Sequence, residues 1–184
     1  VAVTCAGAAL GISGEGNRAD NGGAVYLNDS VFIGQNCSLV DNIATGNGGA
    51  IAADAAFVEV SADEASCNPA DTRCSEMHGN TADSDLDANG YGGAIYTDGG
   101  VLRVDQTYLH NNRANRGGAI YQTGAGATAE IANTLIYSNS VNTPYGAGIR
   151  TAGGAFTMTH TTIAHNTNGA AYSQVSTSSR VANS

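Results

Sequence analysis

The chain of 184 residues contains no tryptophan and no lysine, and only two prolines and three phenylalanines. No stretch approaches the roughly 18 consecutive apolar residues of a membrane-spanning helix, so we expect no transmembrane segment. Large apolar side chains are scarce, and much of the 42% hydrophobic content is alanine. We therefore expect a thin, repetitive core. No basic patch stands out against a net charge of -9, which argues against nucleic acid as a partner.

The charge is unevenly distributed along the chain. The first 105 residues hold all but one of the acidic side chains, whereas residues 106–184 carry Glu130 alone against four arginines. One interpretation is an acidic surface that aids solubility. The other is an axial asymmetry that favours head-to-tail contact between copies, since the sequence shows no amphipathic capping helix at either end.

The four cysteines are Cys5, Cys37, Cys67 and Cys74. An even number in a chain rich in Asn, Thr, Ser and Gly predicts disulfides and an extracellular or cell-surface location. A local bridge between Cys67 and Cys74 would leave Cys5 with Cys37. The competing arrangement stacks Cys37 on Cys74, because each precedes a serine at a similar point of its repeat. Zinc is disfavoured, since the chain has neither a CxxC spacing nor paired histidines.

The dominant pattern is a repeat whose marker is Asn, a short gap, then Gly-Gly-Ala and an aliphatic residue. It occurs at residues 22–26, 48–51, 92–96 and 117–121, with degenerate copies at 146–149 and 169–172. Successive markers lie 23 to 29 residues apart except for one interval of 44 residues. The third repeat therefore contains an insertion, which we place in a loop at about residues 61–91.

Two further strand-like segments with period-two alternation follow most markers. Three short strands per repeat, with Gly and Asn at the corners, are typical of one coil of a parallel β-helix, in which coils stack about 4.8 Å apart. We predict an all-β fold: a single right-handed parallel β-helix of about six coils, forming one domain over residues 1–184. Asparagines at a shared corner predict an amide ladder between coils. They are Asn17, Asn42, Asn80, Asn112, Asn139 and Asn166.

This repeat resembles that of the polymorphic outer membrane proteins and is similar to repeats of secreted bacterial right-handed β-helix proteins. The resemblance is carried by Asn80 with Gly92–Tyr96 and by Asn112–Ala114 with Gly117–Tyr121. It covers about residues 15–172. The resemblance implies a secreted or surface-displayed module with an adhesive or structural role.

A run of alternating oxygen-bearing side chains lies in the insertion and is followed by Gly90. Its members are Asp83, Asp85, Asp87 and Asn89. Such alternation matches the first half of a calcium loop, in which oxygen ligands converge on one cation. The position of the bidentate glutamate of an EF-hand is occupied by Tyr96, so further ligands would have to come from elsewhere. The alternative is a solvated acidic turn.

Enzymatic chemistry finds less support in the residues. A polysaccharide lyase on this fold would combine clustered acids with an Arg or Lys base at one substrate position. Lysine is absent, and Arg103, Arg113 and Arg116 form no recognisable motif with acids. We expect the histidines to be stacked polar neighbours rather than a metal or catalytic set. They are His78, His110, His160 and His165.

One repeat position holds tyrosine in three copies, at Tyr26, Tyr96 and Tyr121, and is interrupted by Ala52 and Arg150. Strand alternation turns this position outward if the preceding aliphatic residue points inward. The tyrosines could bind a sugar or a partner surface, or simply stack between coils.

Together these features predict a non-catalytic structural or adhesive module, with no catalytic residues and no cofactor other than calcium. Its expected partners are a surface glycan, a host or neighbouring-cell protein, or further copies stacked end to end into filaments. The alternative function is a carbohydrate-active enzyme resembling polysaccharide lyases, or a calcium-dependent glycan-binding module.

Overall fold

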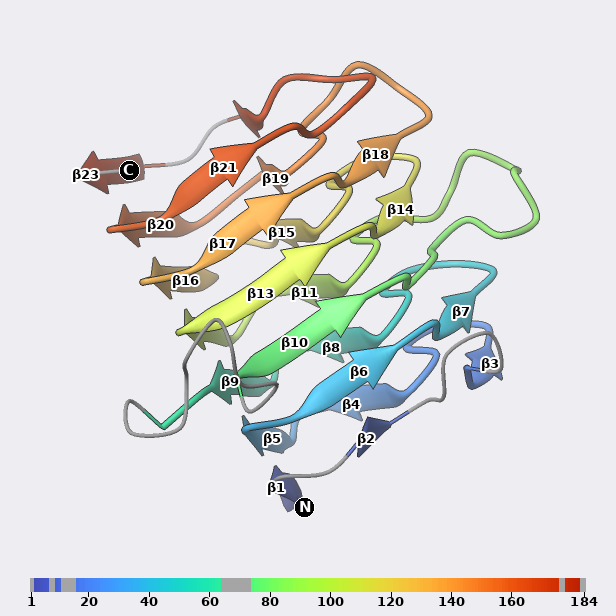
Figure 1. Ribbon diagram of the computed structural model, residues 1–184, viewed down its shortest axis with the longest axis vertical. Coiled ribbons are helices and arrows are strands. Elements are labelled where there is room, and N and C mark those ends of the chain that lie inside the picture. The colour runs from blue at the N-terminus through green and yellow to red at the C-terminus, as the bar shows by residue number, and fades with distance from the viewer. Residues whose placement is uncertain (1, 7–8, 11–15, 64–73, 176–177, 183–184) are drawn as a thin grey trace.

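The structure is a computed structural model that describes residues 2–6, 9–10, 16–63, 74–175 and 178–182. Every regular element within these ranges is a β-strand, and all the strand pairs are parallel (Figure 1). The predicted parallel β-helix of about six turns is confirmed. The described residues include no apolar helix of membrane-spanning length.

The strands form three long sheets, which we number I to III. Sheet I contains β1 (Ala2–Ala6), β5 (Val31–Gln35), β9 (Phe57–Ser61), β12 (Val101–Asp105), β16 (Thr128–Ala132), β20 (Ala155–Thr159) and β23 (Ser178–Ala182). Sheet II contains β2 (Ala9–Leu10), β6 (Ser38–Val40), β10 (Ser75–His78), β13 (Thr107–His110), β17 (Leu135–Tyr137) and β21 (Thr162–Ala164). Sheet III contains β4 (Val25–Asn28), β8 (Ile51–Asp54), β11 (Ile95–Asp98), β15 (Ile120–Thr123), β19 (Ile149–Thr151) and β22 (Tyr172–Gln174).

Two short strand pairs lie at the corner between sheets II and III. They are β3 (Arg18–Ala19) with β7 (Ile43–Ala44), and β14 (Arg113–Ala114) with β18 (Ser140–Val141). Thr81 forms single bridges to both Ile43 and Arg113 and so connects the two pairs. In every long sheet the spatial order follows chain order, so each turn of the chain adds one strand to each sheet. The chain therefore climbs from one end of the rod to the other, as Figure 1 shows.

The core consists of columns of like residues stacked from turn to turn. In sheet III, Ile51, Ile95, Ile120 and Ile149 are direct register partners and are fully buried. Sheet I places Phe32 and Phe156 inward near opposite ends of its own column. Because each turn has a narrow interior, stacking rather than bulk buries these side chains, as the alanine-rich composition predicts.

The Gly-Gly marker has two separate structural causes. The first glycine adopts a left-handed conformation in each full copy, with φ near +60° to +70°, as at Gly92 (φ 70°). The second lies against the next turn: a Cβ on Gly93 would stand 2.1 Å from the carbonyl oxygen of Gly118. A side chain at either position would therefore strain the backbone or push the turns apart.

The six asparagines lie in one line, each bonded to its counterpart in the next turn. Asn112 is representative: its backbone N–H and its Nδ2 both donate to Oδ1 of Asn139, at 3.0 Å each. Its own Oδ1 accepts the same pair of bonds from Asn80, and its Nδ2 also donates to the Met77 carbonyl at 2.9 Å. The four inner members are 0% exposed. The residue before each of these four is left-handed, which turns the asparagine inward.

The extra residues of the third turn form two segments instead of the single loop placed at about residues 61–91. Strand β10 divides them and pairs with β6 and β13, so this part of the predicted loop belongs to sheet II. Consistent with this division, the ladder separations are 38 residues before Asn80 and 32 after it, against 27 for the following steps. Residues 64–73 lie outside the described ranges.

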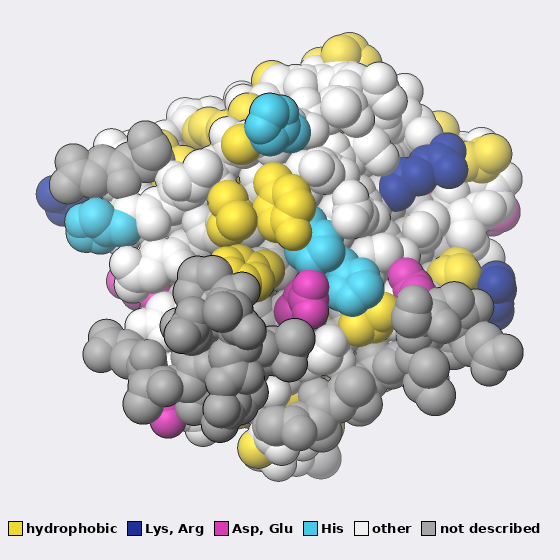
Figure 2. All heavy atoms as spheres, viewed as in Figure 1, with side chains coloured by type: hydrophobic (Ala, Val, Ile, Leu, Met, Phe, Trp, Pro, Cys, Tyr) yellow, Lys and Arg dark blue, Asp and Glu magenta, His cyan; other side chains and the backbone are white. Residues whose placement is uncertain are grey.

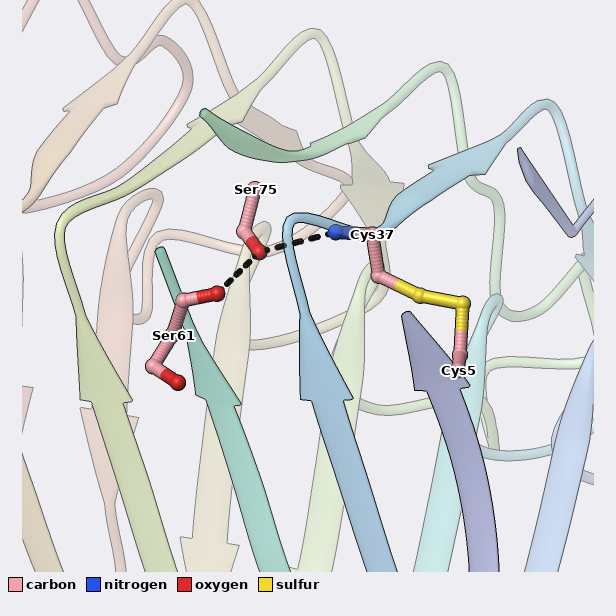
Figure 3. Close-up of a disulfide and its surroundings, with 4 residues drawn as sticks. All are labelled: Cys5, Cys37, Ser61 and Ser75. Atoms are coloured by element: carbon pink, nitrogen blue, oxygen red, sulfur yellow. Dashed lines mark hydrogen bonds between the residues drawn. A yellow bond between two sulfur atoms is a disulfide. The ribbon is translucent and has the colours of Figure 1, made fainter. Parts of the chain in front are cut away.

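A disulfide joins the first two turns between Cys5 and Cys37, whose Cα atoms are 6.0 Å apart (Figure 3). Cys74 is also disulfide-bonded, and Cys67 lies outside the described residues. The alternative stacking of Cys37 on Cys74 is wrong by one residue, because the register pairs Ser38 with Glu76. Ser75 therefore lies beside Cys37, where its hydroxyl accepts the Cys37 N–H and donates to the Ser61 carbonyl.

Candidate functional site

The outer face of sheet III carries the column of tyrosines. Ile95 is fully buried and Tyr96 is partly exposed, so alternation turns the tyrosine position outward as expected. The register aligns Tyr26, Ala52 and Tyr96 on three successive strands, followed by Tyr121. The column is therefore a row of rings on rigid strands that lacks one ring at Ala52.

This row is extended into a cluster by Arg150 on β19 and by Tyr91, Arg116 and Tyr145 from the adjoining corner. The rings of Tyr96 and Tyr121 stack with centroids 5.9 Å apart, and Tyr91 stacks on Tyr121 at 4.9 Å. The Arg116 guanidinium lies 5.6 Å from the Tyr91 ring. It also lies 5.3 Å from the ring of Tyr145, which Arg150 approaches to 4.9 Å. We call this set the aromatic–arginine cluster; its members are Tyr91, Tyr96, Arg116, Tyr121, Tyr145 and Arg150.

A hollow of about 150 Å³ lies where the column lacks a ring. Its walls include Tyr26, which is 58% exposed, and Tyr96, with Ala52 between them. Its rim is polar and consists of Asn21, Asn47, Asp54 and Asp98. The hollow thus combines two aromatic walls with both amide and carboxylate groups, the composition of a site that binds a polar ring.

Hydrogen bonds fix the orientation of the rim amides. Oδ1 of Asn21 accepts the Asn47 backbone N–H at 2.8 Å, and Oδ1 of Asn47 accepts the Tyr91 N–H at 3.0 Å. Both carbonyl oxygens are therefore engaged, which leaves the NH₂ groups as donors. Asp54 and Asp98 are direct register partners at the other side of the hollow and supply acceptors.

Burial raises the pKa of Tyr96 to about 12, and the charges of Asp98 and Asp54 act in the same direction. The phenol therefore stays neutral throughout the physiological range and can both donate and accept a hydrogen bond.

Sheet II carries a different outer column, formed by His78, His110 and Tyr137 in register. The histidine rings stack at 4.9 Å with planes 8° apart, and His110 stacks on Tyr137 at 4.7 Å. Nε2 of His110 lies 2.6 Å from Oε1 of Glu76, and this hydrogen bond is the main cause of the lowered Glu76 pKa. Figure 2 shows histidine side chains gathered with an acidic and several hydrophobic ones near the centre of this face.

These contacts show what the histidines do. His78 and His110 are neighbours in a stack, as expected, whereas His160 and His165 occupy left-handed corner positions. Within the described ranges, the grouping of His, Cys, Asp and Glu side chains close enough to share a metal ion does not include these histidines. The array packs the surface of sheet II.

That grouping is the acidic loop. Carboxylate oxygens of Asp83, Asp85 and Asp87 lie within 4.8 Å of one another. Asp83 is buried and accepts the Ala88 N–H at 3.0 Å, and burial raises its pKa. Asn89 is turned toward Asp87 through a 3.0 Å bond from Nδ2 to Oδ2. The structure therefore brings the three predicted aspartates together and ties the asparagine to one of them.

The arginines considered for lyase chemistry lie apart. Arg103 is in sheet I between Glu59 and Glu130, with Nε 3.9 Å from Oε2 of Glu130 in an exposed pair. Arg113 reaches Asn142 at the corner of the coil, with Nη2 3.1 Å from Oδ1. Arg116 belongs to the aromatic–arginine cluster. These three side chains do not converge on one substrate position, as an acid–base mechanism requires.

Two features were not anticipated from the residues. The Glu76–His110 bond is not evident from the sequence, because β10 lies inside the region assigned to the insertion. The hollow is not evident from the repeat either, in which Ala52 is only an interruption of the tyrosine row. The signal was present: a small residue between two large ones in the same repeat position leaves a gap of one side chain.

Comparison with known proteins supports the repeat assignment. Residues 36–54 match the Chlamydia polymorphic membrane protein repeat. The predicted resemblance is confirmed. The matched turn contains β6, β7 and β8 with ladder residue Asn42 and the marker that begins at Gly48. No curated protein and no solved structure matches the chain at a significant level. A repeat of this kind and the solenoid fold fit a surface-associated β-helical module.

Proposed function

We propose that the protein is a non-catalytic, extracellular or cell-surface adhesive module that binds its partner through the outer face of sheet III. The observation that carries this proposal is the aromatic–arginine cluster with its adjoining hollow. Tyrosine and arginine are enriched at binding interfaces because they give large contact areas and oriented hydrogen bonds. Three members, Tyr96, Tyr121 and Arg150, lie on stacked strands, which fixes their geometry before binding and lowers the entropic cost of binding.

Two further observations fit an exported module. The polymorphic membrane protein repeat belongs to a family of surface or outer-membrane proteins. The buried Cys5–Cys37 disulfide is typical of proteins that fold in an oxidising compartment.

Adhesion can be tested with beads coated with the chain and applied to epithelial and bacterial cell layers. Arg116→Ala together with Tyr145→Ala removes the centre of the cluster, and we expect bead retention to fall severalfold. Arg103→Ala is the matched control, because it removes an arginine and an aromatic contact from sheet I. Equal retention of the wild-type chain, the double variant and Arg103→Ala would contradict the proposal, and so would no retention of any of them.

We further propose that calcium binds at Asp83, Asp85, Asp87 and Asn89, because three carboxylates already converge there. A bound ion stabilises the native state according to its concentration relative to Kd. Calcium at millimolar concentration should raise the melting temperature, and a chelator should reverse the rise. Asp85→Asn with Asp87→Asn should abolish the shift; an unchanged shift in this variant would place calcium elsewhere.

End-to-end stacking into filaments stays a prediction based on the charge asymmetry. Light scattering at increasing protein concentration tests it. A constant monomer mass at high concentration and low salt would rule it out, since opposite charges attract most strongly there.

A further inference from the structure

We propose that the gap at Ala52 is a binding slot for one pyranose ring of a neutral or amino-bearing saccharide, held between Tyr26 and Tyr96. This inference rests on the adhesive function proposed above and names the chemistry of its ligand.

The spacing of the slot follows from the β-helix itself. Neighbouring strands lie about 4.8 Å apart, so side chains two strands apart, such as Tyr26 and Tyr96, are separated by roughly 9.6 Å at the backbone. A ring at the empty position would lie about 4.8 Å from each wall, within the range of stacked ring pairs. Rings on the next pair of strands of this column stack in the same way, since the ring centroids of Tyr96 and Tyr121 lie 5.9 Å apart. A puckered, hydroxyl-bearing ring is thicker than a planar group, so its atoms reach van der Waals contact with both walls of a slot of this width.

The polar rim distinguishes a saccharide from a cation. A guanidinium or ammonium group only donates hydrogen bonds, and Asp54 and Asp98 would suit it. The opposite side of the hollow presents the NH₂ groups of Asn21 and Asn47, whose carbonyl oxygens are engaged by backbone N–H groups. Donors and acceptors facing the same space fit sugar hydroxyls, which do both. The neutral phenol of Tyr96 adds another group of this kind.

The charge of the hollow further limits the class of saccharide that it can bind. Asp54 and Asp98 line the hollow, and Asp20 lies beside Tyr26 in an adjoining depression. None of the side chains that line these two hollows is basic. A uronate would therefore meet like charges in a partly desolvated site, whereas a neutral sugar would not and an amino sugar would gain attraction. The slot thus disfavours the substrates of uronate-cleaving lyases.

The experiment measures binding of the full chain to defined oligosaccharides by calorimetry and by a glycan array. The probes are chitotetraose, partly deacetylated chitotetraose and cellotetraose, with tetragalacturonate as the anionic counterpart and tetra-arginine as the cationic one. We expect binding to at least one neutral or amino-bearing probe, and at least tenfold weaker binding to tetragalacturonate and tetra-arginine.

Two variants locate the binding. Ala52→Tyr fills the slot and should abolish binding, and Tyr26→Ala removes the exposed wall and should weaken it at least tenfold. Thr128→Tyr adds a tyrosine to the exposed face of sheet I and should leave binding unchanged. Far-UV circular dichroism and melting curves establish that each variant is folded. Because Tyr26 is largely exposed, its replacement tests the slot even if Ala52→Tyr disturbs the stack.

Several outcomes would overturn the inference. They are binding to none of the neutral or amino-bearing probes, equal or tighter binding of tetragalacturonate or tetra-arginine, and wild-type binding by folded Ala52→Tyr and Tyr26→Ala. The adhesive proposal is tested independently by the retention of coated beads. If the wild-type chain binds none of the neutral or amino-bearing saccharides, but its beads adhere and those of the Arg116→Ala, Tyr145→Ala variant do not, the slot is wrong and adhesion through the cluster stands.

Discussion

Sheets II and III each carry an outer column of register partners with ring side chains, but only on sheet II do the rings follow one another without a gap. On sheet II, His78, His110 and Tyr137 stack continuously and Glu76 bonds the central ring. On sheet III the column is interrupted at Ala52, and the groups around the gap retain hydrogen-bonding capacity. A solenoid places equivalent residues one strand apart, so each large side chain finds a partner on the adjacent turn. In a filled column the ring faces stack on one another and stabilise the fold, whereas an interrupted column leaves ring faces available to a ligand.

The largest effect should follow from interrupting a column that is both complete and buried. Asn112→Ala removes two acceptor and two donor bonds from the ladder and leaves Asn80 N–H groups unpaired in the interior. Unsatisfied buried groups cost about 1–3 kcal/mol each, so we expect destabilisation of about 3 kcal/mol or more. Urea unfolding followed by circular dichroism measures it. Asn17→Ala is the control: the side chain of this exposed end member donates one bond to the ladder, and its loss should cost less than about 1 kcal/mol. Similar losses in both variants would contradict the role of burial.

A smaller, pH-dependent effect should follow on sheet II. The hydrogen bond from His110 lowers the Glu76 pKa below its ordinary value of 4.5 in the folded chain. A carboxyl group of this kind stabilises the fold above its ordinary pKa, and the contribution disappears as the pH falls through its folded value. Glu76→Gln should therefore be less stable than wild type at pH 6, and the two should converge near pH 3. Parallel stability curves between pH 6 and pH 3 would show that the bond contributes nothing.

On sheet III, folding stability should instead be lost as the pH rises into the alkaline range. Burial raises the pKa of Tyr96 from 10.0 to about 12, so the neutral phenol stabilises the fold below pH 10 and this contribution is lost toward pH 12. Tyr96→Phe cannot ionise, so its stability should fall less than that of wild type between pH 10 and pH 12. Tyr26→Phe, at an exposed position, serves as the matched control and should follow wild type. If Tyr96→Phe falls as steeply as wild type, its ionisation is not coupled to folding.

The fold was predictable because its causes are repeated along the chain. Each marker combines a left-handed glycine with one that touches the next turn, so the pattern recurs wherever a turn begins. The ladder asparagines recur for the same reason. The position of β10 was not predictable, because Cys74–His78 lies inside an irregular interval and lacks the spacing that identifies the other turns. The offset of one residue between Cys37 and Cys74 has the same origin.

The site was less accessible from sequence because its defining feature is a missing side chain. Repetition identified the tyrosine position and its outward direction. It did not show that the carbonyl oxygens of Asn21 and Asn47 would be engaged by backbone, since those contacts join residues of different turns. The convergence of Asp83, Asp85 and Asp87 was suggested by their alternation, but the burial of Asp83 depends on its packing against Gly90.

The smallest effect on stability tests the comparison most directly. Filling the gap with Ala52→Tyr makes the column of sheet III continuous, as that of sheet II already is. Cross-strand pairs contribute about 0.2–1 kcal/mol, so the variant should be unfolded by urea at the wild-type concentration or slightly above it. The new ring would lie between Tyr26 and Tyr96, so the substitution should stabilise the fold weakly while closing the slot. A destabilisation comparable to that of Asn112→Ala would mean that the space beside Ala52 is required by the fold itself, and the contrast between a filled and an open column would no longer hold.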